Sequence, residues 1–283
     1  MLGIKQIAVL VNKMDLVNYS PDVFDDIQKR FVALSASLDI HDVHFVPISA
    51  LHGDNVVDKS EKMPWYKGPT LMYLLENIDI SNDNNYIEKR YPVQYVIRPQ
   101  SEQYPDYRGY AGRIAGGTFA VGDKVKVLPS GITTTVEAID IFGQELMMAS
   151  APQSVTIRLA DDIDISRGDM IVGTDNEPHM GNELKVMFCW FSEQPMKVGG
   201  RYILRHTTQE IKCMITEVIY KVNINTMEQS LTEKHIEMND IGCMVLKTTK
   251  PVFYDVYKKN RITGSLVLID EGTNNTVCAG MII

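Results

Sequence analysis

Hydrophobic residues in the first eighty positions follow two patterns that alternate along the chain. A continuous apolar run at Ile7–Val11 and a mostly apolar stretch at Val43–Ile48 predict two buried strands of a sheet. Between them, Ser20 and Pro21 are typical of a helix start, and apolar residues then recur every three or four positions, which predicts a helix packed on the sheet. This apolar stripe consists of Val23, Phe24, Ile27, Phe31, Leu34 and Leu38.

A shorter helix and a polar segment close this first region. The helix is expected from Pro69 or Thr70 to Glu76, after a turn at residues 65–68. Residues 81–90 are polar, and positions 81–85 contain no apolar residue, which predicts a linker. The alternation of strands and helices before this linker predicts an α/β unit at residues 1–80.

After the linker, the hydrophobic period changes from 3.6 to 2. Polar and apolar residues alternate at Lys124–Val127, and a further strand is expected at Ile132–Ile139, after turn-forming residues at 129–131. Short strands at this spacing are typical of a β-barrel. The first barrel is therefore expected at residues 91–178.

The alternating pattern restarts after a break at residues 174–182. Four apolar residues then fall on one face of a strand: Leu184, Val186, Phe188 and Trp190. Later apolar runs extend the pattern, around residues 211–220, 243–246 and 266–269. A second all-β barrel is thus expected at residues 179–283, so that an α/β part precedes two barrels.

Composition supports a folded protein and narrows its partners. Of the 283 residues, 45% are hydrophobic and 23% are charged, which is ordinary for globular domains. No apolar stretch approaches the roughly eighteen residues of a membrane span, and no secretory signal opens the chain, so we expect a cytoplasmic protein without membrane contact. The net charge of -8 argues against general affinity for nucleic acid. The four cysteines are widely spaced, which favours buried thiols over disulfides or zinc.

The residues that follow the first buried strand carry the candidate chemistry. The sequence there is Asn12-Lys13-Met14-Asp15. The Asp15 carboxylate can accept hydrogen bonds from the ring N–H and the exocyclic amine of guanine, while Asn12 can donate to the other edge of the base. Adenine lacks this donor pair and would leave a desolvated acceptor unpaired, at a cost of about 1 to 3 kcal/mol or more. Lys13 can lay its aliphatic stem along the base and ribose.

The second buried strand leads into Ser49-Ala50-Leu51, a short loop suited to offering backbone N–H groups to the guanine oxygen. Asn-Lys-x-Asp alone also occurs by chance as a polar turn between a strand and a helix, and the agreement between two strand ends makes the guanine interpretation specific. We therefore expect one guanine site built from both loops. No catalytic residue is expected in this chain, because no nucleophile has an identifiable base. No metal ligand is expected either, because Asp161, Asp162 and Asp164 fit an exposed acidic turn and no cysteine lies near His41 and His44.

The position of this motif in the chain predicts only half of a nucleotide site. A complete GTPase places a phosphate-binding Gly-x-x-x-x-Gly-Lys-Ser/Thr loop and its magnesium ligands well upstream, and only eleven residues precede Asn12. The chain is therefore expected to be a truncated piece of a longer protein and to be inactive as a GTPase by itself.

Asn-Lys-x-Asp, Ser-Ala-Leu, the segment 65–71 and the two expected barrels together resemble the translation-factor class of GTPases. In that class a GTP domain precedes two β-barrel domains. A narrower resemblance, over essentially the whole chain, is to the large, GTP-hydrolysing subunit of bacterial sulfate adenylyltransferase (ATP sulfurylase). It depends on the motifs Arg108–Gly112, Val121–Gly131, Ile165–Asp169 and Asn260–Gly264.

This resemblance implies a coupled enzyme of sulfate assimilation. In the family, a small catalytic subunit makes adenosine 5'-phosphosulfate and pyrophosphate from ATP and sulfate, and the large subunit hydrolyses GTP to drive that step. The resemblance assigns Asn12, Lys13 and Asp15 to the guanine base, with Ser49, Ala50 and Leu51 closing the other side. GTP and Mg²⁺ are implied for the full-length protein, and none is expected to bind tightly to this chain.

Two other classes of protein fit the same sequence. A translation elongation factor would share the guanine motif and both barrels, but it must bind aminoacyl-tRNA, which the acidic charge disfavours. A scaffold that binds a protein partner without nucleotide is the third possibility. The preferred reading is a heterodimer with the small subunit, in which the two barrels form a rigid unit that transmits the nucleotide state.

Overall fold

The computed structural model describes residues 6–37, 42–78, 85–99, 107–224 and 226–283. These residues form two compact units, one within Met1–Asp83 and the other within Asn84–Ile283. The division falls in the segment 81–90, where the sequence predicts a linker, although residues 81–84 themselves lie outside the described residues. Each unit is considered by itself below.

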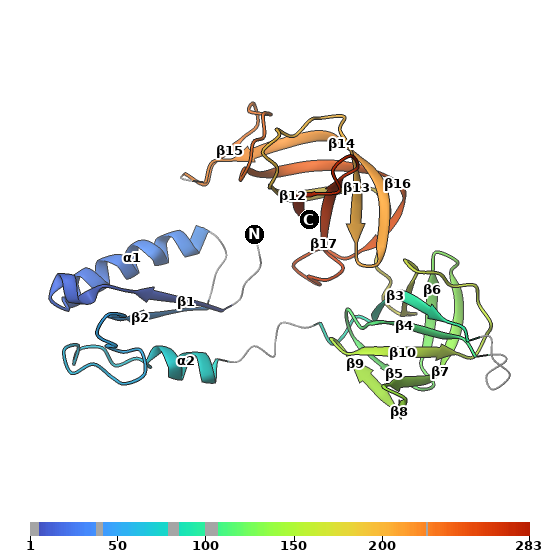
Figure 1. The fold of residues 1–283 in the computed structure, drawn as a ribbon, viewed down its shortest axis with the longest axis horizontal. Coiled ribbons are helices and arrows are strands. Elements are labelled where there is room, and N and C mark those ends of the chain that lie inside the picture. The colour runs from blue at the N-terminus through green and yellow to red at the C-terminus, as the bar shows by residue number, and fades with distance from the viewer. Residues whose placement is uncertain (1–5, 38–41, 79–84, 100–106, 225) are drawn as a thin grey trace. The chain divides into compact units, whose positions relative to one another are not determined.

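The first unit is a parallel two-stranded sheet between two helices (Figure 1). Strand β1 (Gln6–Val11) pairs in register with β2 (Asp42–Pro47), so that Val11 lies opposite Pro47. Successive side chains of a strand point to opposite faces, and both faces are covered. The face that includes Phe45 packs against Phe24 of α1, and the face that includes Val46 packs against Leu74 of α2.

The helices of this unit agree with the pattern in the sequence. Helix α1 (Pro21–Ser37) begins at the predicted residue, and Leu38 lies outside the described residues. Helix α2 (Leu71–Asn77) is capped by Thr70, whose hydroxyl accepts a hydrogen bond from the Tyr73 N–H at 3.4 Å. The apolar stripe of α1 is less buried than predicted, because a two-stranded sheet covers little width. Phe24 is buried, whereas Val23 and Ile27 are 37% and 38% exposed.

Residues 90–173 form a closed antiparallel barrel (Figure 1). Its six strands follow the order β10-β4-β3-β11-β6-β7, and pairing of β10 with β7 closes the ring. Strand β8 extends β7, and β5 pairs with β9 as a separate ribbon. Inward-facing residues of alternate positions, including Tyr91, Tyr110, Phe119 and Ile171, fill its core. The strands are β3 (Arg90–Ile97), β4 (Gly109–Arg113), β5 (Thr118–Ala120), β6 (Lys124–Leu128), β7 (Ile132–Ile141), β8 (Gln144–Leu146), β9 (Met148–Ser150), β10 (Ser154–Leu159) and β11 (Met170–Gly173).

A second six-stranded barrel occupies residues 179–282. Its order is β13-β17-β18-β12-β16-β14, and pairing of β13 with β14 closes it. The predicted face of β12 is correct, since Leu184, Val186, Phe188 and Trp190 are all buried in its core. The strands are β12 (His179–Trp190), β13 (Arg201–His206), β14 (Gln209–Val222), β15 (Gln229–Ser230), β16 (Ile241–Tyr254), β17 (Ser265–Asp270) and β18 (Thr276–Ile282).

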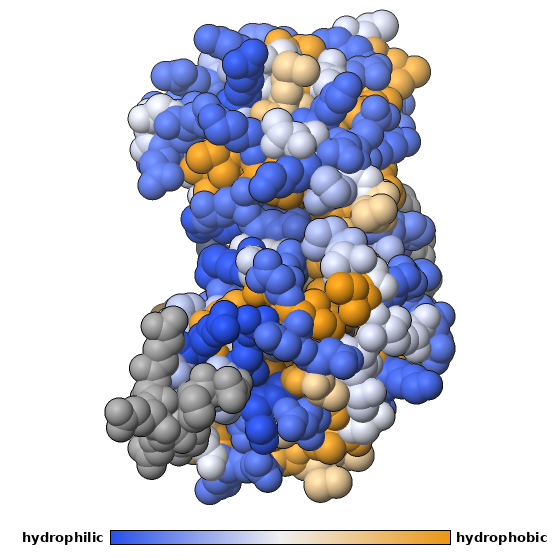
Figure 2. Space-filling view, turned by 90° about the vertical axis from the view of Figure 1, so that its right-hand side faces the viewer, coloured by the Kyte–Doolittle hydropathy of each residue, from blue (hydrophilic) through white to orange (hydrophobic). Residues whose placement is uncertain are grey.

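The predicted fold class, an α/β part followed by two β-barrels, is confirmed. One detail differs: the break expected at residues 174–182 is shorter, because His179 already pairs with Tyr254 and begins β12. All four cysteines are free thiols, as predicted, and Cys189 alone is only half-buried. Among the described residues, no helix is long and apolar enough to cross a membrane. Hydrophilic side chains cover most of the face in Figure 2, and apolar ones gather in separate groups.

Candidate functional site

The two loops that the sequence assigns to guanine meet at one edge of the β1–β2 sheet. Because the strands are parallel and in register, the residues that follow Val11 and Pro47 leave the sheet side by side. Two backbone hydrogen bonds continue the pairing beyond the strands. The Ile48 N–H donates to the Val11 carbonyl at 2.9 Å, and the Met14 N–H donates to the Ile48 carbonyl at 3.2 Å.

Asn12 is held by its side-chain oxygen. Its Oδ1 atom accepts hydrogen bonds from the Lys13 N–H at 2.7 Å and from the Ala50 N–H at 3.0 Å, so it joins the two loops directly. Its Nδ2 amide makes no hydrogen bond to any described residue, and the side chain is exposed. The Asn12 amide group is thus oriented by its oxygen while its donors stay open.

Asp15 is held in the same way by Ser49. The buried Ser49 hydroxyl donates to Asp15 Oδ1 at 2.6 Å. The second carboxylate oxygen, Oδ2, has no hydrogen-bond partner among the described residues. Because Ser49 and Ala50 are consecutive, their partners Asp15 and Asn12 are held next to each other, each with a free hydrogen-bonding atom.

Backbone conformation shapes the rest of the site. Lys13 adopts the left-handed region with φ 65°, which is uncommon for a residue with a side chain and is often associated with function. Its side chain is exposed, as are Ala50 and Leu51, and the Leu51 side chain is 82% exposed. The Ala50 N–H, which the sequence assigns to the guanine oxygen, donates here to Asn12. The Leu51 N–H makes no hydrogen bond within the described part of the chain.

Sequence reasoning missed a set of residues just behind these loops. Asp54 lies at the centre, where its Oδ2 atom accepts a hydrogen bond from the Tyr19 hydroxyl at 3.0 Å and its Oδ1 atom accepts one from the Ser60 hydroxyl at 2.7 Å. Lys62 contacts Tyr19 at 3.1 Å and Asp54 at 3.4 Å. In the sequence, Gly53 alone indicates a turn at this place. In the structure its φ of 75° lets the chain turn back toward Ser49.

Trp65 and Tyr66 pack against the core of this unit. The Trp65 indole N–H donates to the Tyr19 carbonyl at 3.0 Å, and its ring lies 5.4 Å from the Phe24 ring. The Tyr66 hydroxyl bonds the carbonyls of Phe45 and Pro69, both at 3.0 Å. Neither aromatic ring is therefore assigned to a ligand.

A second polar centre lies in the other unit, between its two barrels. Arg90, at the start of β3, is fully buried and forms a bidentate pair with Asp255, which follows β16, through two hydrogen bonds of 2.9 Å. The remaining three N–H groups of the guanidinium donate to the Lys89 carbonyl and to the carbonyl and side chain of Asn176. All five donors are satisfied by protein atoms, so this centre joins the barrels and has no donor left for a ligand.

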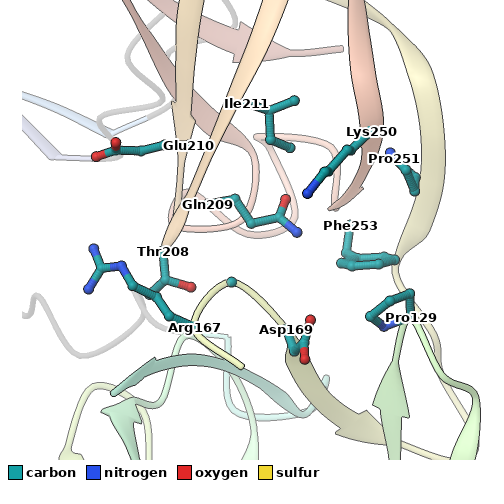
Figure 3. A pocket seen from close by; sticks show the side chains of 11 residues that line it. Pro129, Arg167, Asp169, Thr208, Gln209, Glu210, Ile211, Lys250, Pro251 and Phe253 are labelled. Atoms are coloured by element: carbon teal, nitrogen blue, oxygen red, sulfur yellow. The ribbon is translucent and has the colours of Figure 1, made fainter. Parts of the chain in front are cut away.

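Further contacts cross between the barrels. The Asn260 amide donates to the Ala115 carbonyl at 2.9 Å, and Phe253 packs with Leu128, Met170 and Val172. A cavity of about 490 Å³ lies beside Phe253 (Figure 3). Its walls carry polar and apolar side chains from both barrels, among them Asp169, Gln209 and Lys250.

His206 is buried beside this interface. Its Nε2 atom lies 2.7 Å from the Thr263 carbonyl oxygen, which can only accept, so Nε2 carries the proton. Thr263 in turn donates its hydroxyl to Asp255 at 2.7 Å. Burial lowers the pKa of His206, although Thr263 and the Asp255 carboxylate oppose this effect. His206 therefore stays neutral and belongs to the barrel interface.

Comparison with known proteins identifies what this chain resembles. It is 44% identical over its whole length to the bifunctional enzyme CysN/CysC of Mycobacterium tuberculosis, of which it covers 46%. It is 45% identical, again over its whole length, to sulfate adenylyltransferase subunit 1 of Alteromonas mediterranea, of which it covers 59%. The chain thus spans about half to three fifths of the length of these curated relatives.

A family model and a solved structure give further information on the fold. A family model described as "GTP-eEF1A C-terminal domain-like" matches residues 183–283. The crystal structure of Sup35 complexed with GDP has a TM-score of 0.64 and 22% identity, and the match covers 99% of this chain and 70% of that one. The chain is a homologue of sulfate adenylyltransferase subunit 1 and has the fold of the translation-factor GTPases.

Proposed function

We propose that residues 12–15 and 49–51 form the guanine-binding part of a GTP site in a GTP-hydrolysing subunit of sulfate adenylyltransferase. One observation carries this proposal. Asp15 and Asn12 are each held by one oxygen, at 2.6 Å from Ser49 and 3.0 Å from Ala50, and each keeps a free polar atom at the same edge. A free carboxylate oxygen beside a free amide donor is the arrangement that guanine requires.

Each residue then has a defined task toward the base. Asp15 accepts from the ring N–H and the exocyclic amine, and Asn12 donates to the opposite edge. The aliphatic stem of Lys13 covers the base. The Ala50 N–H holds Asn12 in place, and the Leu51 N–H, which has no partner among the described residues, faces the oxygen of the base. The triphosphate and Mg²⁺ require further groups, so GTP hydrolysis is proposed for the longer protein and none for these residues alone.

The two barrels supply the connection to a partner. Their buried Arg90–Asp255 pair joins them, which suits a unit that moves as a whole when a nucleotide changes. The name of the Alteromonas relative, sulfate adenylyltransferase subunit 1, agrees with a complex that contains another subunit. We propose that this partner is a small subunit that forms adenosine 5'-phosphosulfate from ATP and sulfate.

Saturation-transfer difference NMR tests the nucleotide assignment on this chain. GDP, IDP and ADP would be compared at equal millimolar concentration. We expect the strongest signal for GDP, because inosine lacks the exocyclic amine and adenine lacks both donors that Asp15 accepts. Equal signals for all three nucleotides would contradict the assignment.

Co-purification tests the proposed partner. The chain would be mixed with an ATP-pyrophosphatase-type small subunit, and a complex in gel filtration is the expected result. Salt-sensitive binding of aminoacyl-tRNA in place of this complex would instead favour an elongation factor.

A further inference from the structure

The link between Tyr19 and Asp54 joins the two guanine-recognition loops from behind. Tyr19 follows the first loop and is fixed there by its own backbone, since its N–H donates to the Met14 carbonyl at 2.8 Å. Asp54 follows the second loop and is fixed to Ser49 by two backbone hydrogen bonds of 3.2 Å. The side-chain bond of 3.0 Å between them therefore spans 35 positions and closes a ring of contacts around the site.

Both ends of this link are held in unusual backbone conformations. Asn18 and Tyr19 have φ of 50° and 57°, and Asn55, next to Asp54, has φ of 57°. Non-glycine residues rarely adopt these values, and they persist only where surrounding contacts impose them. The buried Asn55 side chain provides one such contact, because it donates to the Pro47 carbonyl at 2.9 Å.

The charges around the link favour its closed form. Burial opposes ionisation of Asp54, but hydrogen bonds from Ser60 and Tyr19 and the charge of Lys62 outweigh this and hold its pKa below the ordinary value. The pKa of Lys62 lies above its ordinary value, and its hydrogen bond to Tyr19 is the largest cause. At neutral pH the Tyr19 hydroxyl therefore lies between a carboxylate, to which it donates a hydrogen bond, and an ammonium group, from which it accepts one.

We propose that Tyr19 and Asp54 are positioning residues that set the spacing of the two guanine-recognition loops. The inference deepens the proposed function, on which it depends for the identity of the ligand. Neither side chain touches the base. Loss of the link would let the Ala50 N–H separate from Asn12 and the Ser49 hydroxyl separate from Asp15, so that the site discriminates less well between bases.

The first test needs no nucleotide. Amide exchange of Ala50, measured by NMR, reports the 3.0 Å bond to Asn12 that crosses between the loops. In Tyr19→Phe, we expect this exchange to become about 2- to 12-fold faster, the change expected for loss of one hydrogen bond. Asp54→Ala removes the acceptor of the same bond and should accelerate the exchange at least as much. The double variant should add little to Asp54→Ala, because both substitutions remove the same link.

Tyr66→Phe is the matched control. It removes a tyrosine hydroxyl from the same unit, where that hydroxyl bonds the carbonyls of Phe45 and Pro69 and joins no guanine loop. We expect Ala50 exchange in this variant to match the unsubstituted chain. Unchanged exchange in Tyr19→Phe, or equal acceleration in Tyr66→Phe, would overturn the proposal.

The second test measures selectivity. The ratio of GDP to IDP affinity, obtained by NMR titration, should fall toward one in Tyr19→Phe and stay unchanged in Tyr66→Phe. A chain that binds GDP and IDP equally without any substitution would refute the proposed guanine site, and the Ala50 exchange rates would still decide whether the link sets the loop spacing. An unchanged ratio in Tyr19→Phe would overturn the positioning role.

Discussion

The two polar centres of this molecule differ in what satisfies them. In the second unit, every N–H of the Arg90 guanidinium is bonded to a protein atom, and its partner Asp255 is also buried. At the edge of the β1–β2 sheet, Asn12 and Asp15 each use one oxygen for the protein and leave another polar atom open. All hydrogen-bond donors of the Arg90 guanidinium are therefore used to join the two barrels. At the sheet edge, one oxygen of each side chain orients the group, and its other polar atom is open to a ligand.

This difference separates structural polar residues from residues that recognise a ligand. A buried charge with all its partners inside the protein gains nothing from a ligand and loses much when a partner is removed. A polar group that is oriented by the protein but has a free hydrogen-bonding atom destabilises the fold little at the surface, because water can bond to that atom. A matching ligand can then replace the water and bind there. The predictions below test whether the two centres respond to substitution in these opposite ways.

The largest effect is expected at the buried pair. Arg90→Met leaves the Asp255 carboxylate buried without its cation, which should lower the free energy of unfolding of the second unit by about 3 to 5 kcal/mol. Urea unfolding followed by Trp190 fluorescence, in a Trp65→Phe background, measures this loss. The double variant Arg90→Met with Asp255→Leu should recover most of it, since no buried charge then remains unpaired. A loss in the single variant of less than 1 kcal/mol would contradict a structural role for this pair.

The opposite response is expected at Asp15. Asp15→Asn keeps an oxygen for the Ser49 hydroxyl, so the first unit should stay folded, with its thermal midpoint nearly unchanged. The amide no longer offers a charged acceptor to guanine, and GDP affinity should fall about 10- to 150-fold, the range for hydrogen bonds to charged groups. Xanthosine diphosphate, whose base carries an oxygen where guanine carries its amine, should bind this variant better than GDP does. Competitive NMR titration compares the two, and unchanged GDP affinity would argue against the proposed role of Asp15.

Some features of these two centres can be predicted from the sequence, and others cannot. The ends of two buried parallel strands must meet, so the apolar runs before Asn12 and Ser49 are enough to place the guanine loops together. The Tyr19–Asp54 link cannot be read in the same way, because it depends on left-handed conformations at Asn18 and Tyr19 that their sequence does not demand. Arg90 and Asp255 are 165 positions apart on different barrels, and no local pattern connects them.

A pH effect of intermediate size should separate the second unit from the first. Because burial lowers the pKa of His206, the folded protein leaves it neutral, while the unfolded chain takes up a proton below about pH 6.5. The stability of the second unit should therefore fall as pH decreases through 6.5, with a slope of up to about 1.4 kcal/mol per pH unit from this residue. Urea unfolding at pH 7.5 and 5.5 would show a smaller decrease in His206→Gln. An equal decrease in both proteins would assign the effect to other groups.

The smallest loss of stability is expected for an exposed arginine–glutamate ion pair in the same unit. Arg205 bonds Glu210 at 2.6 Å and 3.0 Å, yet both side chains are about half exposed, at 55% and 49%. Arg205→Met should lower the free energy of unfolding by no more than about 1 kcal/mol, because solvent screens the pair. The same urea experiment then compares identical substitutions at Arg90 and Arg205. Similar losses at the two sites would show that burial does not distinguish them.

The most direct measurement is a titration of the ¹⁵N-labelled chain with GDP, followed by chemical-shift changes of the backbone and the Asn12 side-chain amide. We expect weak, saturable binding with little change on addition of ADP at the same concentration. The largest changes with GDP are expected at Asn12, Lys13, Asp15, Ala50 and Leu51. Changes of equal size with both nucleotides, or changes confined to other residues, would contradict a guanine site at this edge of the sheet.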